Sequence, residues 1–196
     1  MQNRIIIIIT DRKEAILPPI EAVLKADFRV KIISNSEPNI LDLLLNNIFV
    51  VGFDHLDARK AKEISNLIEL APAPIFVLDN TAEDDNNKII IQDLLGQLPK
   101  DANLIFNADS DLFNDVCGNQ KVSKFTFGFR DGADFKASDP HINGSSNFKL
   151  NYSGKIIPIW QDKAGNDYVY GALLASCIGI ISGINLVKIS ELLKGS

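Results

Sequence analysis

Two carboxylates flank a histidine in the segment Asp54-His55-Leu56-Asp57, which directly follows an apolar run. Carboxylate oxygens are ligands that hard divalent cations such as Mg²⁺ prefer in proteins. Asp54 and Asp57 are therefore candidate metal ligands. The ordinary alternative for Asp57 is to cap the helix that the following residues predict, by accepting a hydrogen bond from a backbone N–H group.

A second group of candidates follows the first apolar run, in Thr10-Asp11-Arg12-Lys13-Glu14. Phosphate-binding loops at a strand-to-helix junction use glycines, which expose backbone N–H groups, and a lysine that reaches the terminal phosphates. Thr10 and Lys13 are candidates for such contacts. The segment has no glycine, however, and Asp11 and Glu14 place negative charge where phosphates would lie. A conventional phosphate-binding loop is excluded, and a solvated charged turn is the alternative.

The histidines and cysteines suggest no catalytic pair. The chain has only His55 and His141, and Cys117 and Cys177 lie far apart among apolar neighbours. No serine lies in a nucleophile elbow, and neither cysteine has an obvious general base. We predict two buried, reduced thiols and no catalytic residue.

Strands that alternate with helices are expected to position the candidate residues. Continuous β-branched runs are typical of parallel strands buried on both faces. The expected strands are RIIIIIT at 4–10, FRVKIIS at 28–34, IFVVGF at 48–53, PIFVLDN at 74–80 and NLIFNAD at 103–109. Helices are expected at 18–26, 40–47, 57–70, 88–98 and 110–117, with Pro18-Pro19 in the first turn of the first helix. The pattern predicts an α/β fold with a doubly wound, Rossmann-like parallel sheet over 1–120.

From Lys121 onwards, short strand-like segments succeed one another through turn residues, without intervening helices. This pattern predicts an antiparallel β-meander over 121–165 that is attached to the parallel sheet. Two closing helices are expected over 166–196, from Asn166 to Gly183 and from Leu186 to Lys194. We expect one domain over 1–196.

Charge and hydropathy limit the expected partners and compartment. The 196 residues are 46% hydrophobic and carry a net charge of -5, with a pI near 5.0. Such a chain has no basic field to hold nucleic acid or an anionic membrane. No segment is long enough to span a bilayer, and the charged residues after Ile9 end the first apolar run too early for a signal peptide. We expect a cytoplasmic protein.

The last third of the chain carries F-T-F-G, A-D-F-K-A-S-D, a hairpin and G-A-L-L-A-S in that order. This order resembles the end of the central ATPase domain of the Mur ligases, the ATP-dependent amino-acid ligases of peptidoglycan synthesis. The resemblance covers the whole chain and is most specific after Asn107. It implies that Asn107 and Asp109 of the Asn-Ala-Asp segment contact a nucleotide base. The alternative for Asp109 is to cap the helix expected at Ser110.

Other functional positions of the Mur ligase pattern are substituted. Gly52 stands at the magnesium-binding glutamate, and Ile91 at the lysine that is often carbamylated, with Lys88 as a weaker substitute. In the adenine-binding pattern, Asp167 stands at the histidine and Gly171 at the second asparagine. The small residues Gly171, Ala172, Ala175 and Ser176 remain, and we expect them to let the helix pack close to the sheet. The domains that flank the ATPase domain in these ligases are expected to be absent.

The sequence therefore favours a non-catalytic Mur-ligase-like domain with a degenerate ATP site, which acts as a binding or interaction module linked to peptidoglycan precursor synthesis. We expect no cofactor. We expect a protein partner or a homo-oligomer. One alternative is a divergent ATP-dependent ligase subunit that a partner chain completes, and only this reading requires ATP and Mg²⁺. Another is a Rossmann-like small-ligand-binding protein.

Overall fold

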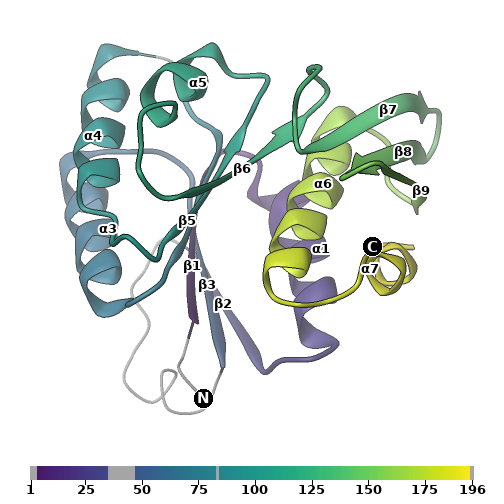
Figure 1. Ribbon diagram of the computed structural model, residues 1–196, viewed down its shortest axis with the longest axis horizontal. Helices are drawn as coiled ribbons and strands as arrows, with labels where there is room; N and C mark the ends of the chain where they lie inside the picture. Colours follow the sequence, from purple (N-terminus) through teal and green to yellow (C-terminus); the bar gives the residue numbers. More distant parts are fainter. Residues whose placement is uncertain (1–3, 35–46, 83, 195–196) are drawn as a thin grey trace. The chain divides into compact units, whose positions relative to one another are not determined.

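The computed structural model describes residues 4–34, 47–82 and 84–194 (Figure 1). The chain forms two compact units. Unit 1 comprises residues 1–11 and 28–124, and unit 2 comprises residues 12–27 and 125–196. The chain therefore leaves unit 1 after the first strand, contributes one helix to unit 2, and returns. The helix expected over 40–47 lies outside the described residues, apart from Asn47.

Unit 1 contains a parallel sheet in the strand order β2-β3-β1-β4-β5. The strands are β1 (Arg4–Thr10), β2 (Val30–Ser34), β3 (Ile48–Phe53), β4 (Ile75–Asn80) and β5 (Asn103–Asn107), and the helices are α3 (Ala58–Leu70), α4 (Asp85–Gly96) and α5 (Asp111–Cys117). The first strand is central, and residues 5–9 are at most 3% exposed. This confirms the strand that is expected from the isoleucine run, because only a strand covered on both faces buries consecutive side chains.

One face of the unit 1 sheet packs against α3, α4 and α5 (Figure 1). Alternate residues of β1, among them Ile7 and Ile9, join Ile64 and Leu67 of α3 and Leu94 of α4 in a single apolar cluster. This packing holds the carboxyl ends of β1, β4 and β5 in register, and the candidate residues lie at these ends.

Unit 2 contains α1 (Lys13–Lys25), α6 (Asn166–Ile181), α7 (Leu186–Leu192) and the strands β7 (Phe135–Ile142), β8 (Ser146–Tyr152) and β9 (Lys155–Gln161). The strand β6 (Ser123–Gly128) begins in unit 1 and ends in unit 2. The three strands β7, β8 and β9 form an antiparallel sheet. The expected α/β class, with parallel strands followed by an antiparallel part and two closing helices, is confirmed.

Two details differ from the sequence-based expectation. Strand β6 pairs with β7 in parallel over Phe127 and Gly128, so the antiparallel part begins one strand later. The carboxylate of Asp134 accepts hydrogen bonds from the backbone N–H and the hydroxyl of Thr126, and these bonds hold the short return between the two strands. Helix α1 begins at Lys13, so Pro18 and Pro19 lie inside it and not in its first turn.

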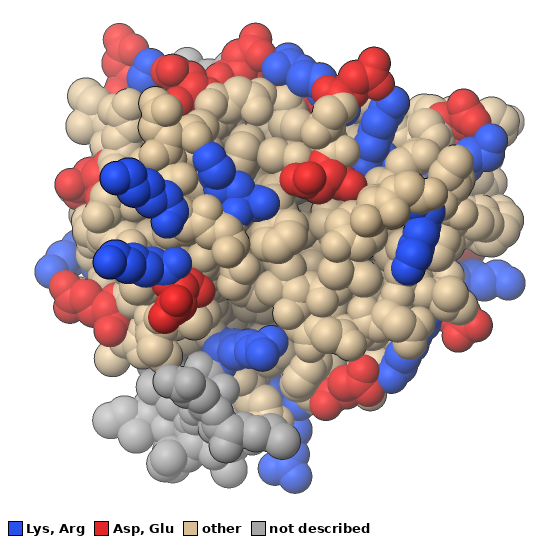
Figure 2. Space-filling view, viewed as in Figure 1, with Lys and Arg blue, Asp and Glu red and all other residues tan. Residues whose placement is uncertain are grey.

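Charged side chains of both signs are interspersed on the face drawn in Figure 2, without a broad region of one sign. Among the described residues, no helix is both long enough and apolar enough to cross a bilayer.

Candidate functional site

Two of the nucleotide candidates are brought together at the carboxyl ends of β1, β4 and β5 in unit 1. The Thr10 hydroxyl donates to the Asp79 carboxylate at 2.6 Å, and the Asn107 side-chain amide donates to the Asp79 carbonyl at 3.1 Å. Thr10 and Asp79 are fully buried, and Asn107 is 6% exposed. Asp79 was not among the site residues predicted from the sequence, although its position at the end of a buried strand was a signal. These polar groups bind one another inside unit 1.

Asp109 does not cap α5, which is the alternative role that its position in the sequence suggested. Its backbone N–H donates to the Asn107 side-chain oxygen at 2.9 Å. The cap of α5 is Ser110, whose hydroxyl accepts from the Phe113 N–H, and the helix begins at Asp111. The expected cap at Asp109 is wrong by one residue, because Asp109 belongs to a turn that the Asn107 side chain closes.

Asp54 and Asp57 both bind Lys60, Asp54 through the lysine side chain and Asp57 through the lysine backbone N–H. The Lys60 ammonium lies 2.7 Å from Asp54 Oδ1 and is 13% exposed, and it also lies 3.1 Å from His55 Nδ1. Within the described residues, no group of three or more His, Cys, Asp or Glu side chains is arranged to hold a metal ion. A lysine thus supplies the positive charge at Asp54, and the metal-binding role of this segment stays a prediction.

Asp57 caps α3, which confirms the alternative to a metal-binding role that the sequence offered. Its carboxylate accepts a hydrogen bond from the Lys60 backbone N–H at 2.8 Å, and this bond holds the pKa of Asp57 below its ordinary value. Because the pKa of Asp57 is lower in the folded than in the unfolded protein, its ionised carboxylate stabilises the fold at pH values above the unfolded-state pKa. This stabilisation is lost as the pH falls through the pKa of Asp57 in the folded protein.

Asp57→Ala should therefore lower the thermal midpoint at pH 7, because the first turn of α3 loses its cap. Asp57→Asn should retain the midpoint, since asparagine caps as well as aspartate. The difference between the wild-type protein and Asp57→Ala should narrow as the pH falls below 3.8. Circular dichroism melts over this pH range measure both effects, and equal midpoints for all three proteins at pH 7 would contradict the cap.

Ile91, which stands at the metal-bridging lysine of the Mur ligase pattern, belongs to the apolar core of unit 1. Ile91 is fully buried between the sheet and its neighbouring helices. Lys88, the weaker substitute, lies on the surface and pairs with Asp115 at 2.7 Å, and this pairing raises its pKa. Neither residue is placed to bridge metal ions.

Lys13, the remaining nucleotide candidate, belongs to unit 2, where it begins α1 and is half-buried. Its neighbour Arg12 is engaged within the same unit. The Arg12 guanidinium lies 4.2 Å from the ring centre of Tyr170, and its Nη1 lies 3.2 Å from Asp167 Oδ1. The cation–π contact and the ion pair connect the start of α1 to the first turns of α6. This role of Arg12 was not predicted from the sequence, because residues so far apart in the chain give no local signal.

Helices α1 and α6 pack in very close contact. A Cβ atom at Gly171 would lie 2.2 Å from the Ala15 carbonyl oxygen, and one at Gly179 would lie 2.8 Å from Val23. Pro19 lacks the N–H group that would bond the Ala15 oxygen in a regular helix, so this oxygen is open to the approaching backbone of α6. Gly171, one of the small residues expected to let α6 pack close to the sheet, thus allows a close approach to α1, and α6 also contacts β7 and β8.

Both cysteines are free and buried, as predicted from the sequence. Burial raises the pKa of the Cys117 thiol to about 12 and raises that of Cys177 well above its ordinary value. Neither thiol is activated for nucleophilic chemistry.

Comparison with known proteins gives structural matches and no sequence matches. No protein-family model matches the chain, and no curated protein matches it. Among solved structures, MurF from Acinetobacter baumannii is similar with a TM-score of 0.73 at 16% identity, over 98% of this chain and 45% of that one. MurF ligase from Thermotoga maritima, solved in complex with ADP, is similar with a TM-score of 0.72 at 12% identity, over 97% of this chain and 48% of that one.

Folylpolyglutamate synthetase from Lactobacillus casei is similar with a TM-score of 0.67 at 9% identity, over 99% of this chain and 62% of that one. The chain thus spans about half the length of the MurF structures that it matches. The expected resemblance is confirmed at the level of the fold: the chain has a Mur-ligase-like fold of the kind expected for the central domain of these enzymes.

Proposed function

We propose that this chain is a Mur-ligase-like domain that no longer hydrolyses ATP or ligates, and that it acts as a binding or interaction module linked to peptidoglycan precursor synthesis in the cytoplasm. The observation that carries this proposal is the connection between β1 and α1. Strand β1 ends at Thr10 and helix α1 begins at Lys13, which leaves only Asp11 and Arg12 between them. A loop that wraps a phosphate group needs several residues with exposed N–H groups.

The use of the candidate side chains supports the same proposal. The Thr10 hydroxyl and the Asn107 amide bind Asp79, and Asp54 binds Lys60. These candidates for contact with a nucleotide and its metal ion thus bind other residues of the chain.

Nucleotide titration tests the proposal. We expect ATP, ADP or ATP with Mg²⁺ to leave the thermal midpoint unchanged, whereas a site filled at 100 times its Kd would stabilise the protein by about 2.7 kcal/mol. A MurF ligase serves as the positive control for the assay. Magnesium-dependent stabilisation that is lost in Lys13→Ala and kept in Lys25→Ala, a change of an exposed lysine on the same helix, would overturn the proposal. It would favour the alternative of a ligase subunit that a partner chain completes.

We also propose that the module works through a protein partner or a second copy of itself. Large apolar side chains are exposed on helices of both units, with Leu70 63%, Ile89 66% and Val187 60% exposed. Exposed apolar residues of this size can contribute to protein contacts. Light scattering at increasing protein concentration should detect self-association. A strict monomer at high concentration would count against self-association and favour a partner that is another protein.

A further inference from the structure

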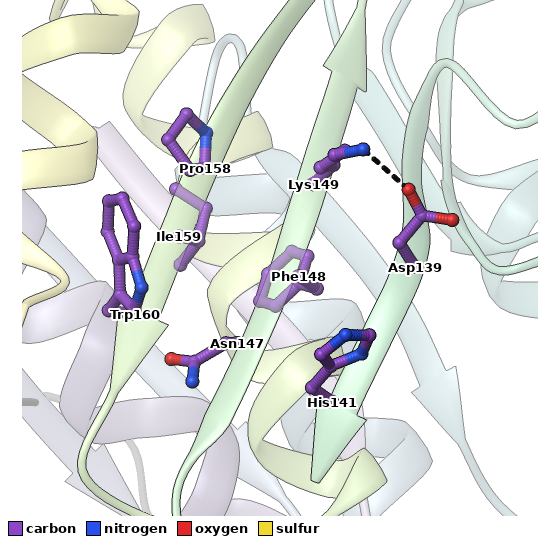
Figure 3. Close-up of a pocket in the computed structure, with 8 residues that line it drawn as sticks. All are labelled: Asp139, His141, Asn147, Phe148, Lys149, Pro158, Ile159 and Trp160. Carbon is purple, nitrogen blue, oxygen red and sulfur yellow. Dashed lines mark hydrogen bonds and ion pairs between the residues drawn. The ribbon is translucent and has the colours of Figure 1, made fainter.

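Trp160 lies on β9 in unit 2, on the exposed face of the antiparallel sheet, and 49% of its surface is exposed. It is the only tryptophan in the sequence. Two hollows meet at this residue. The first, of about 350 Å³, extends over the sheet towards Asp139 and His141 (Figure 3). The second, of about 390 Å³, is bordered by Gln161 and Lys194. Both volumes lie in the range of small-molecule sites, roughly 300–1,000 Å³.

Strand register fixes the polar groups that lie beside the indole ring. Asn147 of β8 pairs with Trp160 on one side and with His141 of β7 on the other, so the three side chains form one row across the sheet (Figure 3). Asn147 borders both hollows. Its side-chain amide can donate and accept, and the row therefore offers an aromatic face next to groups of both hydrogen-bonding kinds.

Gln161 supplies a second, independent indication of a ligand. It borders the second hollow, is 2% exposed, and its Oε1 has no hydrogen-bond partner among the described residues. A buried acceptor without a donor is destabilising, so Gln161 Oε1 is expected to take a donor from outside the described residues. The missing partner must be a donor, for example a hydroxyl group.

The charges around the two hollows balance. Asp139 and Lys149 form an ion pair at 2.7 Å, which holds the pKa of Asp139 below its ordinary value, and Asp162 and Lys194 border the second hollow. A phosphate or carboxylate ligand would favour an excess of positive charge, and a cation would favour an excess of carboxylates. Two acids and two lysines favour an uncharged ligand that donates and accepts hydrogen bonds.

We propose that the surface around Trp160 binds a neutral saccharide, with a sugar ring stacked on the indole, hydroxyl groups on Asn147 and the charged side chains, and one hydroxyl donating to Gln161 Oε1. Sugar rings combine an apolar C–H face with a rim of hydroxyl groups, and this combination matches an aromatic face beside balanced polar groups. The proposal gives a ligand class to the binding module proposed above and rests on that role.

Tryptophan fluorescence tests the proposal directly, because all indole emission of the protein comes from Trp160. Titration with cellobiose, maltose or N,N′-diacetylchitobiose should give a saturable change in emission for at least one sugar. By calorimetry, Trp160→Ala and Gln161→Met should each weaken the binding of that sugar about tenfold or more, the effect of losing one buried hydrogen bond or a comparable contact. Gln161→Met should retain or raise the thermal midpoint, since it removes an unpartnered acceptor.

Ile156→Ala is the matched control, because Ile156 is 63% exposed on the same strand and borders neither hollow. It should bind sugar as the wild-type protein does. No saturable change with any of the three sugars would overturn the proposal, as would tighter binding of inorganic phosphate or Mg²⁺ at this site. An emission change that follows protein concentration and not sugar would also overturn it, and would indicate a second copy on this surface. Nucleotide binding is read separately, by thermal stabilisation with ATP, so failure of the saccharide site and failure of the proposed function are distinguishable.

Discussion

Replacing Gly171 with alanine should lower the free energy of unfolding by about 3 kcal/mol, near the upper end of the usual effect of overpacking a core. The added Cβ would lie 2.2 Å from the Ala15 carbonyl oxygen and 3.2 Å from Pro19 Cγ. Neither atom can move without a shift of the α1 backbone, so α1 and α6 must separate. Urea denaturation followed by circular dichroism measures the loss.

Gly96→Ala is the control for this change. Gly96 is the last residue of α4, and a Cβ atom there meets nothing within 4 Å. Alanine favours a helix over glycine by about 1 kcal/mol, so this variant should be as stable as the wild-type protein or slightly more stable. Equal stability of Gly171→Ala and Gly96→Ala would show that α6 does not approach α1 as closely as described.

The same contact supports the proposal that this chain no longer hydrolyses ATP. Gly171 stands at the second asparagine of the adenine-binding pattern that the sequence resembles. A side chain of any size at this position would collide with Ala15, because α1 occupies the space into which it would extend. The asparagine therefore cannot be restored without moving α1, and Pro19 adapts α1 to this arrangement by leaving the Ala15 oxygen open to α6.

Features that depend on local pattern were predictable from the sequence. The β-branched isoleucine run of β1 predicted a buried strand, and an acidic residue directly before an amphipathic helix offered the Asp57 cap as one alternative. Errors arose where two local signals competed. Pro18 and Pro19 favour a first helical turn, but helix α1 begins at Lys13, because its apolar side chains from Ala15 onwards pack against other elements. Tertiary burial thus outweighed the preference of proline for a helix start.

The candidate site was less predictable, because its contacts join residues far apart in sequence. Nothing near Arg12 indicates that it would lie over Tyr170, and nothing near Asp54 shows that Lys60 would turn back onto it. Substituted positions such as Gly52 and Ile91 could be recognised from the family pattern. What replaced their interactions could be found only from the three-dimensional arrangement, as could the buried hydrogen bond of Thr10.

Thr10→Val should lower the free energy of unfolding by about 2 kcal/mol, because it removes a hydrogen bond to the buried side chain of Asp79. Valine retains the shape of threonine and removes only the hydroxyl that donates to Asp79 at 2.6 Å inside fully buried surroundings. If Thr10 instead contacted a nucleotide, the change would affect ATP binding and leave the stability of the nucleotide-free protein nearly unchanged. The two roles of Thr10 thus predict opposite outcomes.

A double-mutant cycle with Asp79→Ala isolates this bond. The combined variant Thr10→Val/Asp79→Ala should be less destabilised than the sum of the single variants, by about 1.5 kcal/mol, because each single change removes the same interaction. Urea denaturation of the four proteins gives the coupling energy, and a coupling near zero would mean that the hydroxyl and the carboxylate do not bind each other. A large coupling, together with an unchanged response to ATP and Mg²⁺ in all four proteins, would place Thr10 in the scaffold of unit 1 and outside any nucleotide site.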